Sequence, residues 1–261
     1  MENTLEQKRN KLFIVLAGIF ITNALLAEMI GVKIFSAEAT IGLPAANIDI
    51  LGFTMDFNLT AGAVIWPLVF ITTDLINEYF GKPGVKRISY FTALLISYAF
   101  VVIFISIQLA PADFWIDTNS KDAAGNAFNI DYAFNKIFGQ GLRIIIGSLV
   151  AFLLGQLVDV FVFQRLRRIT SSKKLWLRAT GSTLVSQFID SFVVLFIAFY
   201  GVFTNAQIVA IGITNYIYKF LVAIALTPLI YLGHGLIDRY LGKEQAERIS
   251  SDAAKESEGF F

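Results

Sequence analysis

Two carboxylates, Asp74 and Glu78, lie four residues apart near the end of a long apolar run. An i, i+4 spacing places both on one helical face, where like charges repel unless another group compensates them. Insertion scales assign a charged residue at the centre of a bilayer a cost of roughly 2.5–3.5 kcal/mol, so such residues usually line a substrate or ion pathway. The alternative is that the side chains extend to the interface among lipid headgroups, as Glu78 could beside Gly81 and Lys82.

A second charged pair is predicted from depth. At a rise of about 1.5 Å per residue, Asp190 lies roughly 18 Å beyond Arg178, and Lys219 lies roughly 20 Å before Leu232. Because each charge alone is strongly disfavoured at this depth, we expect Asp190 and Lys219 to form an intramembrane ion pair. The pair would either serve a substrate or only clamp two helices together.

A short repeat of the pattern Q-x-x-D-x-F-V brings further polar residues into apolar runs. Gln156 and Asp159 occupy it once, and Gln187 and Asp190 occupy it again. The i, i+3 spacing places each Gln/Asp pair on one helical face. Both segments are therefore predicted to turn a polar edge toward the same interior.

The elements that must position these residues are six apolar runs. The chain has 261 residues, of which 56% are hydrophobic and only 16% charged, as in a polytopic membrane protein. The fold class predicted is all-α, with six transmembrane helices. They run approximately over residues 12–30, 59–80, 88–109, 142–163, 179–200 and 208–232. Trp66-Pro67 and Thr227-Pro228 are expected to kink the second and sixth helices.

Basic residues set the predicted orientation. They gather in segments 8–11, 82–87, 165–178 and 239–255, which lie on one side if the chain crosses six times. The opposite connections are acidic or uncharged in net balance. By the positive-inside rule, both termini are cytoplasmic.

The connections and the C-terminal tail complete the predicted organisation. Segment 36–58 is expected to form a short hairpin, and segment 111–139 a short amphipathic helix. Residues 1–245 are predicted to form a single transmembrane domain. Residues 246–261, with mixed charge, are predicted to be a flexible cytoplasmic tail.

Composition excludes several classes of chemistry. The chain has no cysteine and a single histidine, His234, so we expect no metal site and no cofactor. A net charge of +1 without a basic block argues against nucleic acid. The predicted partners are therefore the lipid bilayer and a small solute, while the oligomeric state stays open. Carboxylates, amides and aromatic rings suit a planar, polar, neutral or cationic molecule with a guanine-like edge.

Two strings resemble one known family, the queuosine precursor transporters, once catalogued as a vitamin-uptake family. They are D-x-x-N-E-x-x-G-K at residues 74–82 and W-L-R-x-x-x-S-T at residues 176–183, followed by Gln187, Asp190, Tyr216, Lys219 and Pro228. The resemblance implies a multi-pass protein of a bacterial inner membrane. It also implies import of 7-deazaguanine precursors of the tRNA nucleoside queuosine, in the 7-cyano or 7-aminomethyl form, for salvage.

The candidate residues follow from the motifs and the resemblance together. The predicted substrate site consists of Asp74, Asn77, Glu78, Gln187, Asp190 and Lys219. Further candidates for its lining are Asn23, Lys33, Trp66, Gln156, Asp159, Arg178, Asn215 and Tyr216. Lys33 matches a family lysine, whereas Arg178 would hold either a headgroup or Asp159.

Two other functions remain open from the sequence. The chain could be the substrate-binding subunit of an ATPase-coupled vitamin-type importer, because it has no G-x-x-x-x-G-K-[ST] loop of its own. Alternatively, Asp74, Asp159 and Asp190 could supply an aspartyl dyad for intramembrane catalysis. Against that, the chain lacks a Gly-x-Gly-Asp signature and places Lys219 beside Asp190, so we expect no enzyme.

Overall fold

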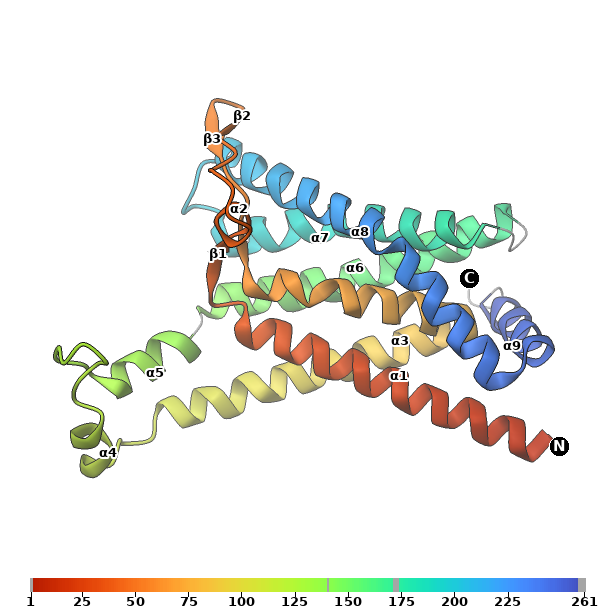
Figure 1. Ribbon diagram of the computed structural model, residues 1–261, viewed down its shortest axis with the longest axis horizontal. Coiled ribbons are helices and arrows are strands. Elements are labelled where there is room, and N and C mark those ends of the chain that lie inside the picture. The colour runs from red at the N-terminus through yellow and green to blue at the C-terminus, as the bar shows by residue number, and fades with distance from the viewer. Residues whose placement is uncertain (1, 140, 171–173, 258–261) are drawn as a thin grey trace.

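The computed structural model describes residues 2–139, 141–170 and 174–257, and its regular structure is mostly helical (Figure 1). The helices are α1 (Glu2–Ile30), α2 (Ala37–Thr40), the 3₁₀ helix η1 (Ala61–Val64), α3 (Trp66–Ile107), α4 (Asp113–Thr118), α5 (Ile130–Phe138), α6 (Leu142–Ile169), α7 (Leu175–Phe199), α8 (Asn205–Leu241) and α9 (Lys243–Glu256). The strands are β1 (Ile34–Ser36), β2 (Ile48–Ile50), β3 (Phe53–Met55) and β4 (Asn58–Thr60).

Five helical stretches of the described chain are long and apolar enough to cross a membrane. They contain α1, α3, α6, α7 and α8, so the molecule is a polytopic helical protein. Most of the second apolar run, from residue 66, and nearly all of the third lie in α3, which spans 42 residues, whereas residues 59–65 precede it in β4 and η1. The strands lie at one end of the bundle and α9 at the other, and these are called here the strand end and the α9 end (Figure 1).

Gly81 breaks α3 into two parts. Its backbone has φ 63° and ψ −169°, a combination that is outside the helical region and that only glycine adopts readily. The two parts of α3 run in opposite directions from this turn, orange toward the α9 end and yellow away from it (Figure 1). A β-carbon at Gly81 would lie 2.6 Å from the carbonyl oxygen of Ala253, so the turn also needs glycine for space.

The two prolines expected to kink helices behave differently from each other. Pro67 lies in the first turn of α3, which begins at Trp66, so the prediction of a kink there is wrong. Proline fits a first turn because the amide it lacks would have no helical partner there. Pro228 lies inside α8, and this helix bends along its course in Figure 1.

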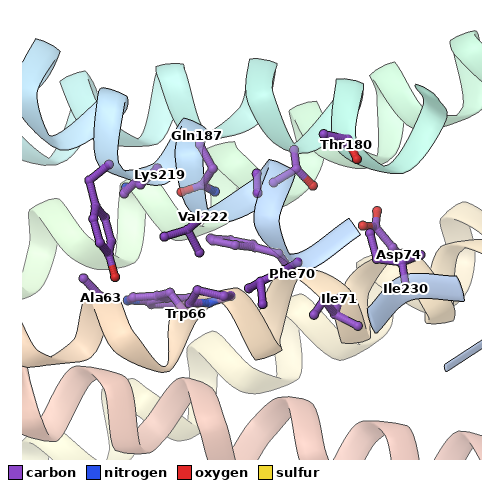
Figure 2. Close-up of a pocket in the computed structure, with 15 residues that line it drawn as sticks. Ala63, Trp66, Phe70, Ile71, Asp74, Thr180, Gln187, Lys219, Val222 and Ile230 are labelled. Carbon is purple, nitrogen blue, oxygen red and sulfur yellow. The ribbon is translucent and has the colours of Figure 1, made fainter. Parts of the chain in front are cut away.

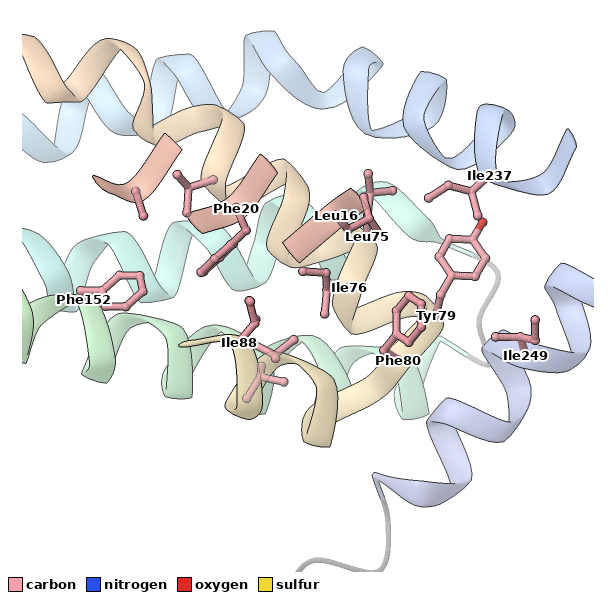
Figure 3. Close-up of a cluster of buried hydrophobic side chains, with 14 of the residues drawn as sticks. Leu16, Phe20, Leu75, Ile76, Tyr79, Phe80, Ile88, Phe152, Ile237 and Ile249 are labelled. Carbon is pink, nitrogen blue, oxygen red and sulfur yellow. The ribbon is translucent and has the colours of Figure 1, made fainter. Parts of the chain in front are cut away.

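Residues 243–256 differ from the expected flexible tail, because they form α9 and pack against α3 and α8. Ala246, Ile249 and Ala253 are buried on the packed face of α9. Ile249 joins the main apolar core, which also contains Phe20 of α1 and Tyr79 of α3 (Figure 3). The mixed charge of this segment therefore belongs to an amphipathic helix, and residues 258–261 of the segment lie outside the described chain.

The hairpin and the helix expected in the connections are both present. Strand β2 pairs with β3 in a hairpin within segment 36–58, and β1 pairs with β4 beside it. A helix, α5, occurs in segment 111–139 as predicted. Glu38 fastens the hairpin region by accepting hydrogen bonds from the Phe57 amide at 2.8 Å and the Ser36 hydroxyl at 3.1 Å. The Phe57 amide is the main cause that lowers the pKa of Glu38 from its ordinary value of 4.5.

Candidate substrate site

A pocket lies between the first part of α3 and helices α7 and α8, and it contains about 520 Å³ of empty space, part of it open to the outside. Figure 2 shows it as an elongated hollow, with Ala63 and Trp66 toward one end and Asp74 and Ile230 toward the other. Trp66 and Phe70 lie one helical turn apart, and their rings stack at 5.8 Å with 17° between their planes. These two rings and Tyr218 give the pocket an aromatic wall.

Polar groups reach this pocket from all three helices. Asp74 comes from α3, Gln187 from α7 and Lys219 from α8, together with the hydroxyls of Thr180 and Thr183. The oxygen Oε1 of Gln187 is buried and has no hydrogen-bond partner among the described residues. An amide and a carboxylate thus lie among the mostly apolar lining residues, beside an aromatic surface.

The predicted ion pair between Asp190 and Lys219 is confirmed. The Nζ atom of Lys219 lies 2.5 Å from Oδ2 of Asp190, which links α8 to α7. Both side chains are about one-fifth exposed, at 21% and 22%, so the pair borders space rather than being sealed in the protein. Lys219 lines the main pocket, and Asp190 lines a smaller hollow next to it.

This second hollow confirms most of what the repeated Q-x-x-D-x-F-V pattern predicted. Gln156 of α6 and Gln187 and Asp190 of α7 line it together, beside Trp66 and Phe70. Asp159 lies outside it but accepts a hydrogen bond at 3.2 Å from Ser186, which does line it. The close approach of α6 and α7 depends on small residues, since a β-carbon at Gly147 would lie 3.2 Å from the Val194 carbonyl.

Glu78 lies outside both hollows, in an ionic cluster at the α9 end. Its Oε1 atom is 2.9 Å from Arg178 of α7 and 3.3 Å from Arg167 of α6. Ser250 of α9 donates a hydrogen bond to the same oxygen at 2.7 Å, and Arg167 also donates to Ser250. Three neighbouring helices thus compensate this carboxylate, which makes it a packing element rather than part of the pocket wall.

Asn77 and Arg178 also lie apart from the pocket. The side-chain oxygen of Asn77 accepts a hydrogen bond from Gln164 at 2.7 Å, across the contact between α3 and α6. Arg178 pairs with Glu78, so the expectation that it holds a headgroup or Asp159 is wrong. The reason is distance along the chain, because Glu78 precedes Arg178 by 100 residues and only the fold brings them together.

Several further candidates do not line either hollow. They are Asn23, which donates to the Ile19 carbonyl at 2.8 Å; Lys33, which lies exposed between α1 and β1; Asn215, which is half-buried; and Tyr216, which packs edge-on against Phe188. Of the wider set, Trp66 and Gln156 do contribute to the lining.

Sequence analysis missed Phe70, Tyr218, Thr180 and Thr183, which line the main pocket. Spacing offered a signal for three of them. Phe70 follows Trp66 by four residues and precedes Asp74 by four, so all three share one face of α3. Thr180, Thr183 and Gln187 recur at three and four residues along α7 in the same way.

The bundle and its pocket define a polytopic α-helical membrane protein with a hollow between its helices, the usual position for a ligand site in such bundles. Comparison with known proteins narrows this class. The family model described as "Putative vitamin uptake transporter" matches residues 60–233, which include every residue that lines the pocket.

Individual relatives carry more specific names. The "Queuosine precursor transporter" of Escherichia coli (strain K12) is 31% identical over 230 residues, which cover 86% of this chain and 90% of the relative. The "Probable queuosine precursor transporter" of Bacillus subtilis (strain 168) is 31% identical over 198 residues, covering 74% and 80%. This chain belongs to the queuosine precursor transporter family, and the predicted resemblance is confirmed. No solved structure matches it.

Proposed function

We propose that this protein imports a 7-deazaguanine precursor of queuosine, in the 7-cyano or 7-aminomethyl form, across a bacterial inner membrane for salvage. The observation that carries the proposal is the pocket between α3, α7 and α8, where the Trp66 and Phe70 rings lie beside Asp74 and Gln187. The name of the Escherichia coli relative supports the same substrate class.

The pocket matches the chemistry of a deazaguanine on two counts. A fused planar ring stacks on aromatic side chains, which is worth about 1–3 kcal/mol per base in nucleic-acid complexes. The amino-pyrimidinone edge presents N–H donors that a carboxylate accepts and a carbonyl that an amide N–H reaches. Asp74 and Gln187 are the proposed partners of that edge, and the Asp190–Lys219 pair borders the same space.

The proposed topology has six spans within a single domain of residues 1–245. The turn at Gly81 supports it, because the two parts of α3 run in opposite directions and would each cross the bilayer. The basic segments then all fall at the α9 end, which we assign to the cytoplasm together with both termini. The pocket lies between that end and the strand end.

Uptake of labelled 7-cyano-7-deazaguanine tests the function directly. Cells that can neither make nor import the precursor should gain uptake, and queuosine in their tRNA, when they express this chain. Gln187→Ala should lower uptake about tenfold at unchanged membrane abundance, because a buried polar contact of about 1.4 kcal/mol is lost. The control Gln245→Ala, exposed on α9, should match the parent protein.

The same uptake by the purified chain in liposomes would separate a self-sufficient carrier from the substrate-binding subunit of an ATPase-coupled importer. Uptake without any ATPase supports the carrier. Failure of expressing cells to take up either deazaguanine would contradict the proposed function.

A further inference from the structure

Two buried carboxylates close to the hollows, Asp74 and Asp159, form no ion pair within the described part of the chain. Asp74 is 3% exposed and Asp159 is 5% exposed. Each has one buried oxygen without a hydrogen-bond partner among the described residues, Oδ1 of Asp74 and Oδ2 of Asp159. An isolated charge of this kind is costly in a low-dielectric interior.

The two carboxylates lie on the packed helices α3 and α6, and the charges near Asp74 are Asp159, Glu78 and Arg178. Thr73, next to Asp74, is 3.2 Å from Gln156, which is one helical turn from Asp159. Asp74 lines the main pocket, whereas Asp159 lies behind it and contacts Ser186, which lines the second hollow. Asp74 thus belongs to the lining of the main pocket, whereas Asp159 contacts the second hollow through the Ser186 hydroxyl.

The other charged groups on the surrounding helices are already paired. On α3, Glu78 is held by Arg167 of α6 and by Arg178 of α7. On α7, Asp190 is held by Lys219 of α8. Arg178 also acts on Asp74 through its charge, without forming an ion pair with it. No cation of the described chain pairs with Asp159, and a proton is the simplest species that can neutralise it.

Polar side chains recur between this pair and the α9 end. Gln164 of α6 donates a hydrogen bond to Asn77 of α3, and beyond them Glu78 lies 3.8 Å from His234 of α8 and accepts a hydrogen bond from Ser250 of α9. Acidic and histidine side chains of this kind serve in proton relays of membrane transporters. The pocket itself gives access from its open side.

We propose that Asp159 binds a proton that is carried inward together with the substrate. This inference rests on the proposed function. One proton from the outer side binds a carboxylate oxygen of Asp159, and in the same cycle it is released to cytoplasmic water, so no bond of the substrate changes. With Asp159 neutral, Asp74 no longer faces a like charge from α6 and accepts the N–H donors of the substrate. Proton and substrate therefore favour the same state of the site, which couples their binding.

The experiment uses the purified full chain in liposomes with the membrane potential held at zero and labelled 7-cyano-7-deazaguanine as the probe. Exchange of labelled for unlabelled substrate at equal pH measures the transport function alone. Accumulation under a pH gradient, acidic outside, measures coupling. One proton per substrate gives an accumulation of up to about tenfold per unit of pH difference.

Asp159→Asn should keep exchange and lose accumulation, whereas Asp159→Glu, which can still bind a proton, should keep both. The matched control Asp238→Asn removes a carboxylate that Tyr79 contacts at 2.7 Å at the α9 end, and it should keep both as well. Size-exclusion profiles of the detergent-solubilised variants show whether each is folded.

Each outcome decides a different point. Exchange by the parent protein without gradient-driven accumulation would overturn proton coupling and leave the proposed function standing. Accumulation that persists in Asp159→Asn would overturn the assignment to Asp159. Absence of exchange with either deazaguanine would overturn the proposed function and, with it, this inference.

Discussion

Asp74 and Glu78 lie one helical turn apart on the same helix, yet their surroundings are opposite. Glu78 contacts Arg167 and Arg178 and accepts a hydrogen bond from Ser250, so ion pairs compensate its charge at the α9 end. Asp74 lines the pocket and has no ion pair with any residue that the structure describes. The neighbouring helices thus give Glu78 a structural role, whereas they leave Asp74 at the pocket, where we propose that it binds substrate.

The largest expected effect is a loss of stability when the ion pairs of Glu78 are removed. Glu78→Ala leaves Arg167 and Arg178 buried without their acceptor, and removal of one partner of a buried ion pair costs about 3–5 kcal/mol. The thermal midpoint in detergent should fall sharply, or folded protein should be lost. Glu247→Ala, exposed on α9, is the control and should change neither. A Glu78→Ala protein of parental stability would contradict the structural role.

Gly81→Ala tests the turn that brings α9 against this cluster. The new β-carbon would lie 2.6 Å from the Ala253 carbonyl at a positive φ, with an expected cost of about 1–3 kcal/mol. Trypsin should then cleave faster after Arg248 and Lys255 of α9. Gly18→Ala, in a helix with open space around its β-carbon, should leave cleavage unchanged. Equal cleavage of the two variants would argue against docking of α9 at Gly81.

Asp74→Asn tests the proposed role of the carboxylate that lines the pocket. Since no ion pair is lost, stability should change by less than about 1 kcal/mol. Uptake of 7-cyano-7-deazaguanine should fall about tenfold or more, because a charge-assisted hydrogen bond is worth about 1.5–3 kcal/mol. An Asp74→Asn protein that loses stability but transports normally would show that Asp74 has a structural role and not a binding role.

The Asp190–Lys219 pair lies between these extremes, because it is paired but about one-fifth exposed. Asp190→Lys and Lys219→Asp should each reduce uptake, and the double reversal should recover part of it. We expect a coupling energy of about 1 kcal/mol after allowance for solvent screening. A double-mutant cycle on uptake and thermal midpoint measures it, and additive losses would show that the two side chains act separately.

The smallest effect is expected at the strand end, where Glu38 holds the segment that leads to the pocket. Because hydrogen bonds lower its pKa in the folded protein, Glu38 stabilises the fold at pH above its ordinary value of 4.5. This contribution is lost as the pH falls through the lowered pKa. The difference in thermal midpoint between the parent protein and Glu38→Gln should therefore be greatest near neutral pH and shrink in acid. A difference that is constant with pH would contradict the role of the charge.

Local sequence was sufficient wherever one helix or one short connection decides the result. The hairpin of segment 36–58 and the helix of segment 111–139 were predicted from turn residues and composition. The kink predicted at Pro67 was wrong because a proline can end, bend or begin a helix. Only the structure, in which α3 begins at Trp66, shows that Pro67 lies in a first turn. The docking of α9 was missed because its mixed charge resembles that of a solvated tail.

The sequence by itself determined the apolar helices and the Asp190–Lys219 pair, since opposite charges at one depth in an apolar medium have strong reason to meet. The same argument identified Asp74 and Glu78 as significant but could not separate them. Only the tertiary structure did so, because the partners of Glu78 lie 89 to 172 residues away in sequence, and side-chain contacts at such separations depend on how whole helices pack.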